Sequence, residues 1–202
     1  AHALLQSRSS ARSLQIVNEG YRLPFLPGSA VPDSTTDHIR QNYVTPSHPE
    51  GPWVTRQLQL MLDSGALANH DRQTHAGAFF SSPLFVVPKA QGTGLRLIID
   101  MREINSHLRT EPFSLAPSML QYNRDLFRKG NGVFVIDFTS SFQHIQIHPE
   151  HQRFFGITWA GHRFVMTVAP YGCSTVPEMF QTVAGITRDV AFRIGLSPDL
   201  TT

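Results

Sequence analysis

The sequence lacks several features on which whole classes of protein depend. Cys173 is its single cysteine, so no disulfide can form within the chain. No apolar run approaches the ~18–20 residues of a membrane-spanning helix, and no apolar segment typical of a signal peptide follows Ala1. Charged residues are scarce at 16%, and the formal net charge is only +2, whereas disordered chains combine low hydrophobicity with high net charge. These absences exclude a disulfide scaffold and a disordered chain, and they predict a protein without a membrane segment.

The sequence does contain enough apolar material for a packed core. Hydrophobic residues make up 41% of the 202 residues, which suits one large domain or two small ones. The chain begins with Ala rather than Met, so we expect a processed chain or a fragment of a longer one. Cations recur along it, at Arg8, Arg12, Arg22, Lys89, Arg96, Arg102 and Arg109. Spaced cations contact phosphates in nucleic-acid-binding proteins, although a solvated surface is the more ordinary explanation.

Ten histidines are an unusually high number, and His144, His148 and His151 invite a metal interpretation. Residues 142–148 alternate between polar and apolar side chains, which predicts a half-buried strand. On a strand, His144 and His148 share a face but lie about 13 Å apart, at ~3.3 Å per residue. Since that distance is too long for one ion, no zinc site is expected here.

Hydrophobic periodicity and turn signals predict a mixed α+β fold. Residues 1–51 are expected to be largely irregular, because they combine a polar basic stretch with several prolines. The expected elements are, in order, a helix at 53–66, a hairpin at 84–100, a helix at 117–127, a strand at 133–137, a hairpin at 154–166 and a helix that Thr175 and Glu178 open with a capping box. Helices and strands mix without regular βαβ alternation, which argues against a doubly wound parallel sheet.

Three local features suggest chemistry, and each has an ordinary alternative. Asp137 ends an apolar strand, where a carboxylate can bind a metal or cap the next turn. Lys89 and Arg96 lie on opposite limbs of the first hairpin, where they can share an anion such as a triphosphate or simply face solvent. Tyr171 precedes Gly172 in a tight loop, where its ring can stack on a base or pack in the core.

Taken together, five blocks resemble the ordered motifs of a retroelement reverse transcriptase. They are residues 82–89 (SPLFVVPK), 96–105 (RLIIDMREIN), 134–142 (FVIDFTSSF), 169–174 (APYGCS) and 177–180 (PEMF). The resemblance covers about residues 52–192. Residues 20–25 (GYRLPF) resemble the lead-in of DIRS-like, tyrosine-recombinase retrotransposons, with gypsy-type elements and pararetroviruses as near alternatives.

The resemblance implies a right-hand polymerase with fingers and a partial palm. The N-terminal extension would occupy residues 1–51 and the reverse transcriptase domain residues 52–202. Within that domain the fingers would cover about 52–111 and 145–175, and the partial palm about 112–144 and 176–202. The implied activity is transfer of dNTPs to a primer 3′-hydroxyl on an RNA or DNA template, which places the protein inside the cell, in the cytoplasm or the nucleus.

The resemblance also implies roles for individual residues. Asp137 would be the first catalytic aspartate and would bind two Mg²⁺ ions, one of which would also take the backbone carbonyl of Phe138. The remaining implied residues contact the dNTP. Lys89 and Arg96 would clamp the triphosphate, and the backbone amides of Ser140 and Ser141 would touch it. Phe142 would pack against the sugar as a steric gate, and Tyr171 and Gly172 would line the nucleotide and template base. This division of labour suits phosphoryl transfer, which needs metals and cations on the developing charge.

One departure from the family is large. Its next block contains two adjacent aspartates, and this chain has no Asp-Asp dipeptide. Because one carboxylate cannot hold two divalent ions tightly, we expect the isolated chain to be inactive and the rest of a polyprotein to be missing. The alternative is a catalytically inactive module derived from a reverse transcriptase, which binds nucleic acid or acts as a scaffold. Two milder departures are Ser141, where many relatives have alanine, and Tyr171, where many have Phe or Gln.

Overall fold

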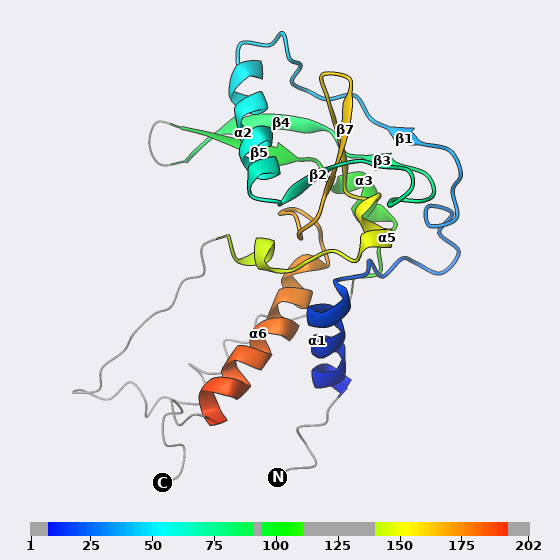
Figure 1. The fold of residues 1–202 in the computed structure, drawn as a ribbon, viewed down its shortest axis with the longest axis vertical. Helices are drawn as coiled ribbons and strands as arrows, with labels where there is room; N and C mark the ends of the chain where they lie inside the picture. Colours follow the sequence, from blue (N-terminus) through cyan, green and yellow to red (C-terminus); the bar gives the residue numbers. More distant parts are fainter. Residues whose placement is uncertain (1–7, 91–93, 111–139, 194–202) are drawn as a thin grey trace, which may run out of the picture.

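The computed structural model describes residues 8–90, 94–110 and 140–193, with no side-chain description for 8–10 and 185–193. Figure 1 shows two β-sheets in the upper part of the molecule and two helices that run side by side below them. The expected helix at 117–127, the expected strand at 133–137 and the tip of the first hairpin lie outside the described residues.

The larger sheet is mixed and has five strands in the order β1-β3-β6-β7-β2. Their bounds are His38–Ile39 (β1), Leu67–Asn69 (β2), Phe80–Ser81 (β3), Gly156–Trp159 (β6) and His162–Met166 (β7). β3 pairs in parallel with β1 and β6, whereas β7 pairs antiparallel with β6 and β2. The described part of the fold is therefore a mixed α/β arrangement with a mixed sheet, as the α+β expectation requires.

Both expected hairpins are present. β6 and β7 are joined by Ala160 and Gly161, whose φ angles are 49° and 79°. Two successive positive φ angles are typical of the tight turn that matches the twist of the flanking strands. β4 (Leu84–Pro88) and β5 (Leu95–Ile99) pair antiparallel as a separate two-stranded sheet.

The first expected helix is also present, with its bounds shifted towards the N-terminus. α2 runs from Gly51 to Asp63 and has a proline in its first turn, where a missing N–H costs nothing. Val54 and Leu58 are buried on one face, as the periodicity predicted. Gly65, with a φ of 74°, follows the end of the helix.

The N-terminal segment is not irregular throughout, and this expectation is corrected. Residues Arg8–Glu19 form a helix, α1, which lies beside α6 (Val176–Arg193) in Figure 1. Ile16 is buried, and the Ser13 hydroxyl donates to the backbone carbonyl of Thr182. α1 carries few apolar residues, and two of them, Leu14 and Val17, are exposed while Ser13 is buried. Packing against α6 therefore stabilises a helix that the sequence alone does not reveal.

The rest of this segment is largely irregular apart from β1, and several of its residues pack on the core. Tyr21, Leu23 and Val44 belong to one hydrophobic cluster together with Val54 of α2 and Ile157 of β6. This cluster crosses residue 51. The division of the chain at that residue stays a prediction.

The strand expected at residues 142–148 is absent. It does not form, because Ser141–His144 form a 3₁₀ turn (η3) that follows Ser140, a residue with a positive φ of 52°. A short helix, α5 (Pro149–Gln152), then follows isolated bridges at Gln146 and Ile147.

The expected capping box of α6 is also corrected. The helix begins after Thr175 as predicted, but the Glu178 carboxylate accepts two hydrogen bonds from Arg12 of α1, at 2.8 and 3.1 Å. The predicted start of α6 is therefore confirmed, whereas Glu178 pairs with Arg12 and so links α6 to α1.

Candidate functional site

The first hairpin holds both of its expected cations on one face. The Lys89 amide donates to the Gly94 carbonyl at 2.9 Å, and Arg96 lies opposite Val87. Because side chains alternate along a strand, Lys89, Val87 and Arg96 share a face. A Cβ atom at Gly94 would lie 3.4 Å from the Lys89 side chain, so the lysine stem passes over this glycine. Both cations are exposed, and their arrangement suits one polyvalent anion.

A mainly apolar cavity of about 210 Å³ lies beside the same hairpin. Its walls come from α2, β5, η3, β7 and the loop that leads into α6. The lining residues are Met61, Leu97, Ile98, Ile99, Gln143, Met166, Pro170, Tyr171 and Gly172. The strand that carries Arg96 therefore also forms a wall of the cavity.

Tyr171 and Phe142 meet at this cavity. Their ring centroids are 5.1 Å apart, and the Phe142 ring contacts Phe180 of α6 edge-on at 5.5 Å. Tyr171 is 52% exposed, whereas Phe142 is half-buried against the core. Phe142 thus packs against a tyrosine ring that is still about half exposed. Ser140 and Ser141 lie just before Phe142, at the start of η3.

A side chain to which the sequence analysis gave no role fixes this loop. The Asn105 Nδ2 donates to the Gly172 carbonyl at 2.9 Å, and the Ser174 amide donates to the Asn105 Oδ1 at 2.9 Å. Gly172 adopts a φ of 93°, which glycine tolerates best. The only signal available in the sequence was the position of Asn105 at the end of the second block.

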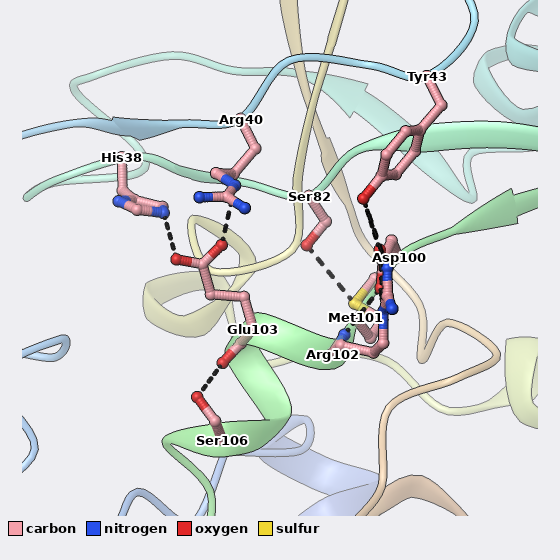
Figure 2. Close-up of polar contacts among 9 residues, drawn as sticks. All are labelled: His38, Arg40, Tyr43, Ser82, Asp100, Met101, Arg102, Glu103 and Ser106. Atoms are coloured by element: carbon pink, nitrogen blue, oxygen red, sulfur yellow. Dashed lines mark hydrogen bonds and ion pairs between the residues drawn. The ribbon is translucent and has the colours of Figure 1, made fainter.

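Asp100 and Arg102 form a tight ion pair at the end of β5 (Figure 2). Arg102 Nη2 lies 2.6 Å from Asp100 Oδ2, its Nε lies 2.9 Å from Oδ1, and Tyr43 Oη donates to Oδ2 at 3.3 Å. Hydrogen bonding by Arg102 lowers the pKa of Asp100 to about 2. The Arg102 side chain is nevertheless 82% exposed, so the pair holds a guanidinium in a fixed place at the surface.

The short helix α3 (Arg102–Ser106) is anchored to the N-terminal segment (Figure 2). Glu103 Oε1 lies 2.7 Å from His38 Nε2, and its Oε2 lies 3.1 Å from Arg40 Nε. A larger cavity of about 340 Å³ lies on this side of the molecule, lined by Asp37, His38 and Glu103 among others. Asp37 pairs with Arg72 and Arg163. Both carboxylates of this cavity are therefore already engaged by cations.

The histidines that invited a metal interpretation serve other contacts. His151 Nδ1 accepts from the Leu23 amide at 2.9 Å, and His148 caps α5 by accepting from the Glu150 amide. Within residues 8–90, 94–110 and 140–193, no group of three or more His, Cys, Asp or Glu residues could hold a metal ion.

Asp137 and Phe138, the expected metal-binding positions, lie outside the described residues. The role of Mg²⁺ and of these two residues therefore stays a prediction. In the part of the chain that the structure does describe, no helix is long and apolar enough to cross a membrane.

Comparison with known proteins finds a sequence similarity to a retroviral polyprotein and a fold similarity to a reverse transcriptase structure. No protein-family model matches the sequence. Over 110 residues the chain is 29% identical to the Gag-Pol polyprotein of Walleye dermal sarcoma virus. The matched region covers 50% of this chain and 6% of that polyprotein. The fold is similar, with a TM-score of 0.52 and 19% identity, to the foamy viral protease-reverse transcriptase dRH solved with double-stranded DNA. That match covers 80% of this chain and 25% of the foamy viral chain.

These two similarities support a weak sequence relationship to a retroviral Gag-Pol polyprotein and a mixed α/β fold like that of the foamy viral reverse transcriptase structure. This chain spans only a small part of either relative. The assignment of fingers and palm stays a prediction, as do the retroelement subfamily and the roles of the individual site residues.

Proposed function

We propose that this chain is the nucleotide-binding and template-binding part of a retrotransposon RNA-directed DNA polymerase. The reaction is the transfer of a deoxynucleotide to a primer 3′-hydroxyl, directed by an RNA or DNA template. The observation that carries the proposal is that one strand, β5, carries Arg96 and also forms a wall of the cavity that Tyr171 and Gly172 line.

The proposed substrate fits this geometry in three parts. Lys89 and Arg96 clamp the triphosphate, because a point charge and a planar fork together suit its oxygens. The base and sugar enter the apolar cavity, where the open face of Tyr171 stacks on an aromatic surface. Phe142 lies behind Tyr171 and limits the space beside the sugar, which disfavours a 2′-hydroxyl. The backbone amides of Ser140 and Ser141 complete the anion contacts.

Magnesium is part of this proposal through the family resemblance alone. Asp137 would hold it with the carbonyl of Phe138, and the ions would neutralise charge that develops on the transferred phosphoryl group. This chain's own residues bind and orient the nucleotide, and the exposed cations Lys89 and Arg96 keep its phosphates fixed.

The template and primer are the proposed macromolecular partners. Arg102 offers a fixed and exposed guanidinium beside the half-exposed ring of Tyr43, a pairing that suits a nucleic-acid backbone and an unstacked base. The foamy viral relative was solved with double-stranded DNA, which is consistent with a nucleic-acid partner here.

A second candidate function is a catalytically inactive module that binds nucleic acid or acts as a scaffold. The absence of an Asp-Asp dipeptide from the chain favours it. Such a module keeps the nucleic-acid surface but has no need of a dNTP site. Nucleotide binding therefore distinguishes the two functions.

The test is binding of a Mg·dNTP to the full chain in the presence of a primer–template. We expect the double variant Lys89→Ala/Arg96→Ala to bind the nucleotide about tenfold or more weakly, because charge-assisted hydrogen bonds are lost. Arg56→Ala is the matched control, since Arg56 is exposed on α2. Nucleic-acid binding without dNTP binding would favour the inactive module instead.

A further inference from the structure

The loop of residues 170–174 is tied at two points by a single side chain. Asn105 donates to the Gly172 carbonyl through Nδ2 and accepts from the Ser174 amide through Oδ1, both at 2.9 Å. The two bonds use both ends of one planar amide, so they fix the orientation of the loop as well as its position. Tyr171 lies immediately before the first of these points.

The underside of the loop is held by neighbouring backbone and side chain. A Cβ atom at Gly172 would lie 3.7 Å from the Ile99 carbonyl and 3.7 Å from the Met101 side chain. The loop therefore rests on the end of β5 and on the residue that precedes α3. With Asn105 on one side and this platform below, the Tyr171 ring has a defined place at the cavity.

Asn105 belongs to α3, and Figure 2 shows how Glu103 of this helix contacts His38 and Arg40. Glu103 ties α3 to His38 and Arg40, and Ile104 is fully buried. The Asp100 amide donates to the Pro83 carbonyl at 2.8 Å, which ties the start of α3 to the chain just before β4. Because α3 is fixed relative to the hairpin, the hydrogen bonds of Asn105 also fix Gly172 and Ser174 relative to the hairpin.

We infer that Asn105 is a positioning residue that couples the cation-bearing hairpin to the nucleotide-facing loop. It touches no nucleotide. It holds Gly172 and Ser174 at a set distance from β5, so that Tyr171 faces the base and sugar while Lys89 and Arg96 face the phosphates of the same nucleotide. This inference rests on the proposed function, because it needs the cavity to be the nucleotide site.

The Ser174 amide gives a direct readout of the loop contact. It donates to Asn105 in the wild-type chain, so its hydrogen exchange, measured by NMR, reports this bond. We expect Asn105→Ala to raise the exchange rate of this amide about tenfold or more. Asn105→Asp keeps an acceptor at that position, and we expect its Ser174 amide to stay protected.

Nucleotide affinity gives the second readout, measured with Mg·dTTP and a primer–template that presents adenine as the next base. We expect Asn105→Ala in the full chain to weaken dTTP binding about tenfold, because the loop no longer holds Tyr171 in place. A loss of folded protein is checked by thermal unfolding of the same samples.

Asn42 is the matched control because its side chain has the same chemistry at another place. Its Nδ2 donates to the Thr158 carbonyl at 2.6 Å, and its Oδ1 accepts from the Leu84 amide at 2.9 Å. We expect Asn42→Ala to lower the unfolding temperature as Asn105→Ala does, while Ser174 exchange and dTTP affinity change less than about twofold.

Each remaining outcome has a distinct meaning. Unchanged Ser174 exchange in Asn105→Ala would overturn the inference whatever the affinity. Faster exchange with an affinity equal to that of Asn42→Ala would show that Asn105 holds the loop without serving the nucleotide, which also overturns it. If the wild-type chain itself binds no dTTP, the proposed function fails and the coupling with it, while the exchange data still decide whether Asn105 holds the loop.

Discussion

The imidazole of His151 lies where the N-terminal segment meets the core. Its Nδ1 accepts from the Leu23 amide, and its ring packs near Phe25 and edge-on against Phe154. Burial is the main cause that lowers the pKa of His151 to about 4, with the nearby charges of Arg22 and His148 adding to it. Since an acceptor nitrogen carries no proton, this contact requires the neutral ring.

This geometry predicts a pH-dependent stability with a defined window. The unfolded pKa of histidine is about 6.5, so the unfolded state binds the proton first as the pH falls from there towards 4. The stabilising contribution is therefore fully present above pH 6.5 and is lost as the pH falls. We expect the free energy of unfolding to drop by about 1–2 kcal/mol from this group between pH 7 and 4.5, a value reduced for its partial exposure.

Urea unfolding of the full chain across that range measures the slope. In His151→Gln the side-chain oxygen can still accept from Leu23 without titrating, so the His151 part of the slope should disappear. His162→Asn is the control, because His162 is exposed at the start of β7. An unchanged slope in His151→Gln would contradict the explanation.

At the scale of single elements, β6 depends on the absence of a side chain at its first residue. A Cβ atom at Gly156 would lie 2.4 Å from the Phe79 ring and 2.6 Å from the Phe80 carbonyl. Phe79 is fully buried, so neither the ring nor the backbone has room to move. This close approach allows β6 to pair with Ser81 of β3 and keeps the mixed sheet continuous.

We therefore expect Gly156→Ala to destabilise the chain by about 3 kcal/mol, as overpacking of a dense core does. Gly28→Ala is the control, because Gly28 has a φ of 78° but open space around the added carbon, and a conformational cost of about 1 kcal/mol is expected there. Urea unfolding compares the two variants. Equal losses would indicate that packing at β6 is looser than the structure implies.

The helices and strands that could be predicted are those whose nearby residues determine whether they form a helix or a strand. α2, the two hairpins and the start of α6 follow from helical spacing, strand alternation and turn residues such as Ala160-Gly161. α1 was missed because its few apolar residues gain from packing against α6, a partner far along the chain. The strand expected at 142–148 failed because alternation cannot reveal the positive φ of Ser140.

The candidate site shows the same division. Strand alternation was enough to predict that Lys89 and Arg96 can share a face. The motif resemblance assigned Phe142 and Tyr171 to one nucleotide site without predicting that their rings lie 5.1 Å apart. The link from Asn105 to Gly172 and Ser174 spans about seventy positions in sequence, and nothing local marks it. The Arg102–Asp100 pair is close in sequence, but its exposure and rigidity depend on Tyr43 and on the anchoring of α3.

At the scale of the whole molecule, the residues proposed to bind the nucleotide differ from the carboxylates that catalysis would need. The described residues supply cations, an apolar cavity and an aromatic pair, all of which suit the binding and orientation of the proposed nucleotide. The catalysis that the resemblance to reverse transcriptases implies needs carboxylates that hold two metal ions about 3.5–4 Å apart. This sequence offers Asp137 at one expected position and contains no Asp-Asp dipeptide for the others. Binding without turnover is the expected state of the 202-residue chain.

Primer extension by the purified chain tests this separation. With magnesium, dNTPs and a primer–template, we expect no product above a control without protein, because a single carboxylate cannot hold both ions tightly and a large share of the rate enhancement is therefore lost. Asp137→Ala should then differ from the wild type only in nucleotide and metal affinity. Extension that is robust in the wild type and lost in Asp137→Ala would show that another carboxylate, such as Asp189 or Asp199, completes the site. That result would make the chain an active polymerase by itself and would leave the inactive-module alternative without support.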